Sequence, residues 1–171
     1  MKNILFIGLL TLSTLTLAKD FDTFIGVELG STNLQFDQVD SQRATDYGFR
    51  LGFTKDTGRV YLSVNRASFD AITLTSTALN FDAITPRAYR FNDSFSLRGL
   101  LGLHAGFAQI DPDNLAKDEG AMGGAKAAML LDFPADITLE VGISGTWPAL
   151  YAGTVAVKNY QHAYLAFDYT F

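Results

Sequence analysis

The feature that most constrains this chain is a two-residue alternation of apolar and other side chains that recurs from about residue 23 to the last residue. It is clearest at the C-terminus, where Ala163, Leu165, Phe167, Tyr169 and Phe171 fall on one face and the intervening residues on the other. A period of two indicates half-buried β-strands, whereas an amphipathic helix repeats every 3.6 residues. The chain is therefore expected to be all-β.

The alternation occupies eight segments of the chain. These are residues 23–31, 47–53, 60–64, 72–82, 97–107, 121–133, 137–144 and 163–171. Seven have a clear apolar face, but in 72–82 three threonines at odd positions compete with Ile72 and Leu74, which leaves the orientation of this segment open. Eight consecutive strands predict an eight-stranded antiparallel up-and-down β-barrel, which has no free sheet edge and is therefore expected to be monomeric.

The connections between these segments differ in character at the two ends of the barrel. Tight turns at 55–58 and 134–136 and a looser link at 86–93 fall at one end. The links at the other end, near 32–45, 66–71, 110–119 and 147–159, are mostly longer and more polar. Outer-membrane barrels have short periplasmic turns and longer external loops, so we expect four external loops that are available for binding.

A soluble barrel of the lipocalin type is the alternative, with its polar face outward. Here that polar face consists mainly of Gly and small residues with isolated charges, as a crowded interior requires. Five phenylalanines recur where the strands meet the short turns and predict an aromatic girdle at the membrane interface: Phe24, Phe53, Phe81, Phe133 and Phe171. We therefore expect a transmembrane barrel, the closed form in which strands satisfy their backbone groups in lipid.

The N-terminus carries an export signal. A positive start at Met1–Asn3 precedes an uncharged apolar run over 4–17, which ends in Thr16-Leu17-Ala18. This run is shorter than the roughly 20 residues of a membrane-spanning helix. We expect residues 1–18 to be a cleaved signal peptide and residues 19–171 to form the barrel in the bacterial outer membrane.

Charge and cysteine usage exclude several classes of function. A net charge of −5 argues against a nucleic-acid partner, which requires a basic face. The absence of Cys excludes a disulfide scaffold, a thiolate metal site and a thiol enzyme.

The last strand carries the one specific motif. Leu165-x-Phe167-x-Tyr169-x-Phe171 resembles the C-terminal assembly signal of outer-membrane barrels. With the signal peptide and the eight segments, the chain resembles the OmpA/OmpX-type small eight-stranded outer-membrane β-barrel family. The resemblance implies recognition by the barrel-assembly machinery, and contact with outer-membrane lipid and lipopolysaccharide. No cell-wall tethering is carried over, because the likeness is confined to the barrel.

Several charges occupy positions that face the lumen if odd positions face lipid. Glu28, Arg50, Arg98, Glu140 and Asp168 each lie three or four residues from the short-turn end, with Lys126 above them. We predict an internal salt-bridge network that includes Glu28 and Arg50. It either plugs the lumen, which eight strands leave just wide enough for side chains, or gates a porin-like channel for small solutes.

An enzyme is the remaining class, because some eight-stranded outer-membrane barrels modify lipid A. The only histidines, His104 and His162, have lumen parity, and neither is followed two residues on by the Ser of the deacylase pattern. Two histidines without a third ligand do not define a metal site. We expect no catalytic residues, no cofactor and no metal.

Residues 110–119 are acidic but lack EF-hand spacing, so a solvated loop is favoured over a weak Ca²⁺ site. Trp147 is expected to mark the outer membrane interface. The leading expectation is a structural barrel with a surface-interaction role.

Overall fold

The computed structural model describes residues 21–37, 40–90, 95–113 and 116–171. The predicted signal peptide lies outside these residues. Among the residues described, no helix has the length and hydropathy needed to cross a membrane.

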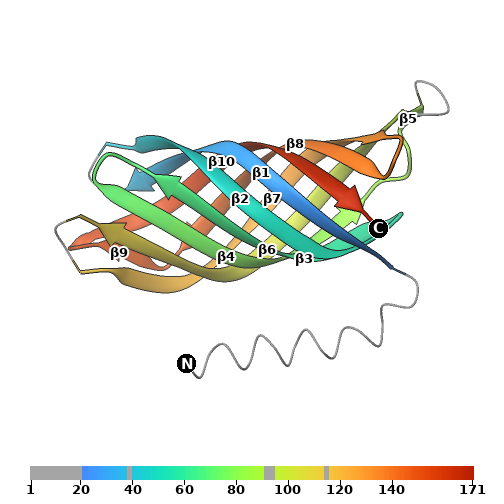
Figure 1. The fold of residues 1–171 in the computed structure, drawn as a ribbon. Coiled ribbons are helices and arrows are strands. Elements are labelled where there is room, and N and C mark those ends of the chain that lie inside the picture. Colours follow the sequence, from blue (N-terminus) through green and yellow to red (C-terminus); the bar gives the residue numbers. More distant parts are fainter. Residues whose placement is uncertain (1–20, 38–39, 91–94, 114–115) are drawn as a thin grey trace.

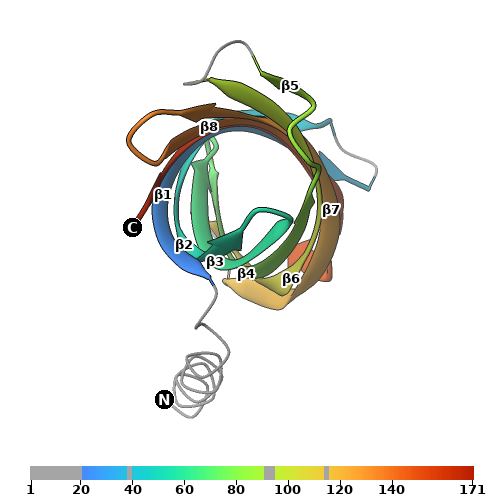
Figure 2. The same ribbon diagram turned by 90° about the vertical axis from the view of Figure 1, so that its right-hand side faces the viewer.

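Eight long antiparallel strands close into a barrel (Figures 1 and 2), which confirms the predicted fold class. They are β1 (Asp22–Phe36), β2 (Gln42–Lys55), β3 (Gly58–Ser68), β4 (Ile72–Ile84), β6 (Ser96–Pro112), β7 (Asp118–Phe133), β8 (Ile137–Pro148) and β10 (Val155–Thr170). Each strand pairs with its neighbour in this order, and β1 pairs with β10 to close the ring. Two short strands, β5 (Tyr89–Arg90) and β9 (Leu150–Ala152), pair with β6 and β10.

Apolar side chains cover the outside of the barrel in a continuous belt. Its exposed members include Val27, Leu29, Phe49, Leu51, Val64, Phe81, Leu103, Met129, Val141, Ile143 and Phe167. The charged side chains that alternate with them, such as Glu28 and Arg50, are buried in the lumen. This inside-out polarity is that of a barrel in lipid, as predicted, and not that of a lipocalin.

The outward face changes parity in one strand. The tight turn at 56–57 places Lys55 opposite Gly58, so outward-facing Phe53 pairs with Val60 and the even positions of β3 face outward. The β3–β4 pairing restores the odd parity, because Val60 pairs with Phe81. This settles the segment left open: the threonines of β4 lie on its outer face, and Leu74 is buried inside.

The strands extend well beyond the apolar belt. A tilted strand crosses a bilayer in about 9–11 residues, whereas β6 has 17 and β10 has 16. The extra residues lie at the end opposite the start of β1 and the end of β10. They have polar outward side chains such as Asn33, Arg43 and Gln109, and buried apolar inward ones such as Leu34 and Ile110. We call this part the collar: residues 31–36, 42–45, 66–68, 72–77, 108–112, 118–120 and 155–161.

The predicted contrast in connection lengths is therefore wrong. The connections beyond the collar cover only 37–41, 69–71, 113–117 and 149–154. The longest connection in the barrel, 85–95, lies at the opposite end, where β1 begins and β10 ends (Figure 1). The polar outer face of the collar gave its strands the composition of loops. Their inward apolar residues explain why they continue the barrel.

The predicted aromatic girdle is wrong at Phe24. This residue has even parity on β1 and is 1% exposed, because it points into the lumen and packs edge-on against Tyr61, with ring centroids 5.5 Å apart. Phe81 and Phe171 face outward and are exposed, whereas Phe53 and Phe133 are partly covered.

Candidate functional site in the barrel lumen

Two arginines from neighbouring strands form the centre of a buried charge network. Arg50 on β2 contacts Asp168 (Nε–Oδ1 2.8 Å), Glu140 (Nη1–Oε2 3.1 Å) and, more loosely, Glu28 (Nη1–Oε2 3.6 Å). Arg50 and Glu140 are both 0% exposed. Since these residues come from β1, β2, β8 and β10, the network ties together the strands at the closure of the barrel.

Arg59 on β3 carries the network across the lumen. Its guanidinium contacts Asp82 (Nε–Oδ2 2.6 Å), Asp168 (Nη1–Oδ2 3.0 Å) and Glu140. Lys126 from β7 reaches Asp82 (Nζ–Oδ2 2.9 Å) and the hydroxyl of Tyr61. All of these side chains are nearly inaccessible to solvent, so each charge depends on its partners for stabilisation.

The Tyr61 ring lies among the three cations. The ring centroid is 4.5 Å from Lys126 Nζ, 5.0 Å from Arg59 Cζ and 5.7 Å from Arg50 Cζ. On the other side of the network, the hydroxyl of Tyr164 donates to Glu140 Oε1 at 2.6 Å. Cation–π contacts of this kind add to the ion pairs when the groups are desolvated.

The structure places five of the six predicted lumen charges in this network: Glu28, Arg50, Lys126, Glu140 and Asp168. Arg98 lies apart and pairs with Asp132 on the neighbouring strand at 2.6 Å, so its predicted place in the same layer is wrong. The tilt of the strands explains the error, because equal distances along different strands from their turns are not equal heights in a sheared barrel.

Sequence reasoning missed three members of the network, Arg59, Tyr61 and Asp82. Arg59 sits at an odd position, which the single parity rule assigned to lipid, although β3 is inverted by the tight turn before it. The alternation of Val60, Leu62 and Val64 carried that signal. Asp82 lay in the segment whose orientation was open.

A second polar group lies beside the network and contains one of the predicted histidines. His162 Nε2 is 2.8 Å from Asp46 Oδ1, and His162 Nδ1 is 3.7 Å from Glu28 Oε1. The hydroxyl of Thr32 donates to Asp46 Oδ2 at 2.8 Å. The other predicted histidine, His104, shares a 2.8 Å hydrogen bond with Thr146.

Apolar side chains fill the lumen inside the collar. This apolar cap consists of Leu34, Ala44, Ala67, Leu74, Ala78, Ala108, Ile110, Met122, Leu150, Val157 and Tyr160. A smaller apolar cluster of Ile84, Leu100 and Leu130 also lies in the lumen. A polar cavity of about 50 Å³ is lined by residues of both layers, among them Glu28, Lys126 and His162 from the charged side and Met122 and Tyr160 from the cap.

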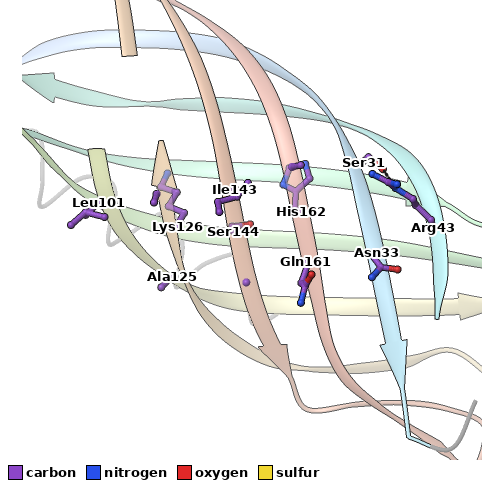
Figure 3. A pocket seen from close by; sticks show the side chains of 13 residues that line it. Ser31, Asn33, Arg43, Leu101, Ala125, Lys126, Ile143, Ser144, Gln161 and His162 are labelled. Carbon is purple, nitrogen blue, oxygen red and sulfur yellow. Dashed lines mark hydrogen bonds between the residues drawn. The ribbon is translucent and has the colours of Figure 1, made fainter. Parts of the chain in front are cut away.

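A shallow groove of about 820 Å³ marks the outer wall where belt and collar meet (Figure 3). Ser31, Asn33 and Arg43 line its polar part, and Arg43 Nε donates to the hydroxyl of Ser31 at 2.8 Å. Gln161 and His162 are neighbours on β10 (Figure 3), and the first is exposed whereas the second is buried. Both residues line the groove, and His162 also lines the lumen cavity.

The acidic stretch 110–119 lies half in strands, with 110–112 in β6 and 118–119 in β7. Asp111 lies in β6 and pairs with Lys117, whereas Asp118 begins β7 and accepts the Tyr151 backbone N–H at 2.6 Å. Trp147 is exposed on the outer face of β8. The residues of the resembled assembly signal, Leu165, Phe167, Tyr169 and Phe171, all face outward at the closure of the barrel.

Comparison with known proteins identifies the fold. No family model matches the chain, and no curated protein matches its sequence. Among solved structures, Neisserial surface protein A is similar with a TM-score of 0.65 at 10% identity, over 87% of this chain and 97% of that one. The N-terminal β-barrel domain of Pseudomonas aeruginosa OprF is similar with a TM-score of 0.54 at 17% identity, over 88% of this chain and 99% of that one.

These likenesses show a shared fold: the small eight-stranded outer-membrane β-barrel. They agree with the closed ring and the apolar outer belt of this chain. The closed barrel and its likeness to these outer-membrane proteins agree with the bacterial outer membrane, the location predicted from the sequence.

Proposed function

We propose that this protein is a structural outer-membrane barrel with a closed lumen, whose collar is displayed for surface interactions. The observation that carries the proposal is that two layers of side chains, one charged and one apolar, fill the lumen. The charge network occupies the level of the belt and the apolar cap occupies the level of the collar. A solute would have to break buried ion pairs at one level and displace packed aliphatic side chains at the other.

The surface available for interaction differs from the long loops expected. Because the connections beyond the collar are short, the collar wall itself is the larger presented surface, with exposed Arg43, Arg66 and Gln161 on its outer face. The proposed environment is outer-membrane lipid and lipopolysaccharide, reached through the barrel-assembly machinery. A closed ring leaves no strand edge for pairing, which supports a monomer.

The proposal is non-enzymatic. A hydrolase needs a nucleophile within hydrogen-bond reach of its base. The hydroxyl of Thr146 lies 2.8 Å from His104 Nε2, but Thr146 is buried in the lumen, where a lipid substrate has no access. His162 contacts two carboxylates and no hydroxyl nucleophile. Unchanged lipid A on mass spectrometry of cells that express the protein would agree with this, whereas a loss or gain of an acyl chain would contradict it.

Single-channel recording tests the closed lumen. The refolded wild type is expected to give no conductance steps in a planar bilayer. Arg50→Ala perturbs the network alone and Leu34→Ala the cap alone, so each single variant is expected to stay closed, while the double variant shows openings. Folding of each sample is verified by the altered gel migration of the unheated barrel. Stable openings from folded wild type would establish the channel alternative instead.

A further inference from the structure

We propose that Glu28, Asp46 and His162 form a site inside the barrel for one divalent transition-metal ion, most suitably Zn²⁺. Each residue offers one ligand atom, and the three atoms lie within 4.8 Å of one another. All three side chains are more than nine-tenths buried. An imidazole nitrogen with two carboxylates suits zinc better than Mg²⁺ or Ca²⁺, which prefer oxygen ligands alone.

Two buried atoms of this group lack hydrogen-bond partners among the described residues. They are Asp46 Oδ1 and His162 Nε2, which face each other at 2.8 Å but do not meet hydrogen-bond geometry. In a tetrahedral shell, two atoms bound to one zinc ion at about 2.0–2.2 Å lie about 3.3–3.6 Å apart, with their lone pairs converging on the ion. Binding would therefore move Asp46 Oδ1 and His162 Nε2 apart by about 0.5–0.8 Å from their present 2.8 Å. An ion would satisfy both atoms at once.

The surrounding residues hold the ligands in place and leave room between them. Thr32 donates to Asp46 Oδ2, and Asn65 Nδ2 donates to Glu28 Oε1 at 2.9 Å, so each carboxylate is oriented by a second residue. Gly30 lies between the ligands. A Cβ at this position would be 2.2 Å from His162 Nε2 and 2.9 Å from Asp46 Oδ1.

Charge balance favours a dication at this place. Among the described residues, five buried carboxylates, Glu28, Asp46, Asp82, Glu140 and Asp168, belong to the network and the adjoining histidine group, against three cations, Arg50, Arg59 and Lys126. Asp82, Glu140 and Asp168 contact Arg59 directly. Glu28 contacts Arg50 only at 3.6 Å, and within the described part of the chain Asp46 pairs with no Arg or Lys. The two excess negative charges thus lie on the two carboxylate ligands.

The adjoining cavity supplies the remaining coordination position. Glu28 and His162 line it, and its volume of about 50 Å³ accommodates a water ligand. Three protein ligands and one water give zinc its usual four-coordinate shell. The apolar cap and the charge network then keep the ion away from bulk solvent.

The test uses the untagged full-length mature chain, refolded in detergent with ZnCl₂ or CoCl₂ so that a closed site is loaded during folding. After gel filtration, we expect about one zinc per chain by metal analysis, and intense visible absorption from four-coordinate Co²⁺. Asp46→Asn keeps the side-chain shape, and His162→Gln keeps a polar side chain of similar length. Each removes a ligand and is expected to lower the retained zinc at least tenfold. His104→Gln, the matched control, should retain the metal.

A second readout separates a site from a folding defect. Excess Zn²⁺ should raise the urea midpoint of the wild type and of His104→Gln but not that of His162→Gln, because an ion that binds only the folded state stabilises it by mass action. Folded wild type without retained zinc would overturn the proposal. So would stoichiometric zinc that persists in both ligand variants.

Discussion

The belt and the collar of this barrel are built from the same strands but with opposite polarity. In the belt, apolar residues such as Val27 and Phe49 face outward and charges such as Arg50 face inward. In the collar, Asn33 and Gln109 face outward, while Leu34 and Ile110 are buried inside. The first arrangement suits lipid, and the second is that of a soluble barrel. The solvent outside the wall therefore determines what fills the lumen at each level.

The largest expected effect comes from a charge inside the belt. Arg59→Ala removes the partner of Asp82, Glu140 and Asp168 and leaves carboxylates uncompensated in a buried site. We expect a loss of about 3–5 kcal/mol in the free energy of unfolding, measured by urea titration in lipid vesicles. Arg66→Ala, on the outer face of the same strand in the collar, is the control and should cost less than about 0.5 kcal/mol. Equal losses would remove the distinction between the two regions.

A charge placed on the outer face should report which solvent each region contacts. Leu103→Arg puts a guanidinium in the belt, where Leu103 is 65% exposed, and is expected to cost about 2–4 kcal/mol. Thr75→Arg puts the same group on the outer face of the collar and should change the free energy of unfolding by less than about 0.5 kcal/mol. The same urea titration compares them, and a cost at Thr75 that matches the one at Leu103 would place the collar in lipid.

The smallest expected effect concerns space rather than charge. A Cβ at Gly52 would approach Val60 O to 2.3 Å and Tyr61 Cα to 2.5 Å, and backbone atoms cannot move aside cheaply. Gly52→Ala is therefore expected to destabilise the barrel by about 1–3 kcal/mol. At Gly123, on the outward parity of β7, the nearest atom would be 3.8 Å away, so Gly123→Ala is the matched control. A neutral Gly52→Ala would show that the belt-level lumen is loosely packed.

The sequence was sufficient to predict the barrel, its strand number and its inside-out polarity, because alternation reports directly which face of each strand is apolar. It was insufficient wherever a residue's neighbours depend on register. Arg59 was missed because one two-residue turn inverts the parity of β3, and Arg98 was misplaced because strand shear changes heights. The collar was interpreted as loops, since polar outward residues such as Asn33 and Arg43 have the same composition as a loop.

The Glu28–Asp46–His162 group also could not be predicted from the sequence, because it depends on strand register. Asp46 lay between the predicted link at 32–45 and the predicted strand at 47–53 and was assigned to neither. Only the pairing of β1 with both β2 and β10 brings it to His162 across Gly30. Two histidines and scattered acids in a sequence do not define such a group. The antiparallel register does.

Depth-dependent labelling tests the change of polarity most directly, and the absence of native Cys makes every single-Cys variant unambiguous. Four positions on the outer face of β1 are suitable for single substitutions: Val27→Cys, Leu29→Cys, Asn33→Cys and Gln35→Cys. With the barrel folded in vesicles, a membrane-impermeant maleimide is expected to modify positions 33 and 35 and to spare 27 and 29. All four should react after unfolding. Protection of all four positions in the folded state would contradict the account, because the collar would then lie within the bilayer.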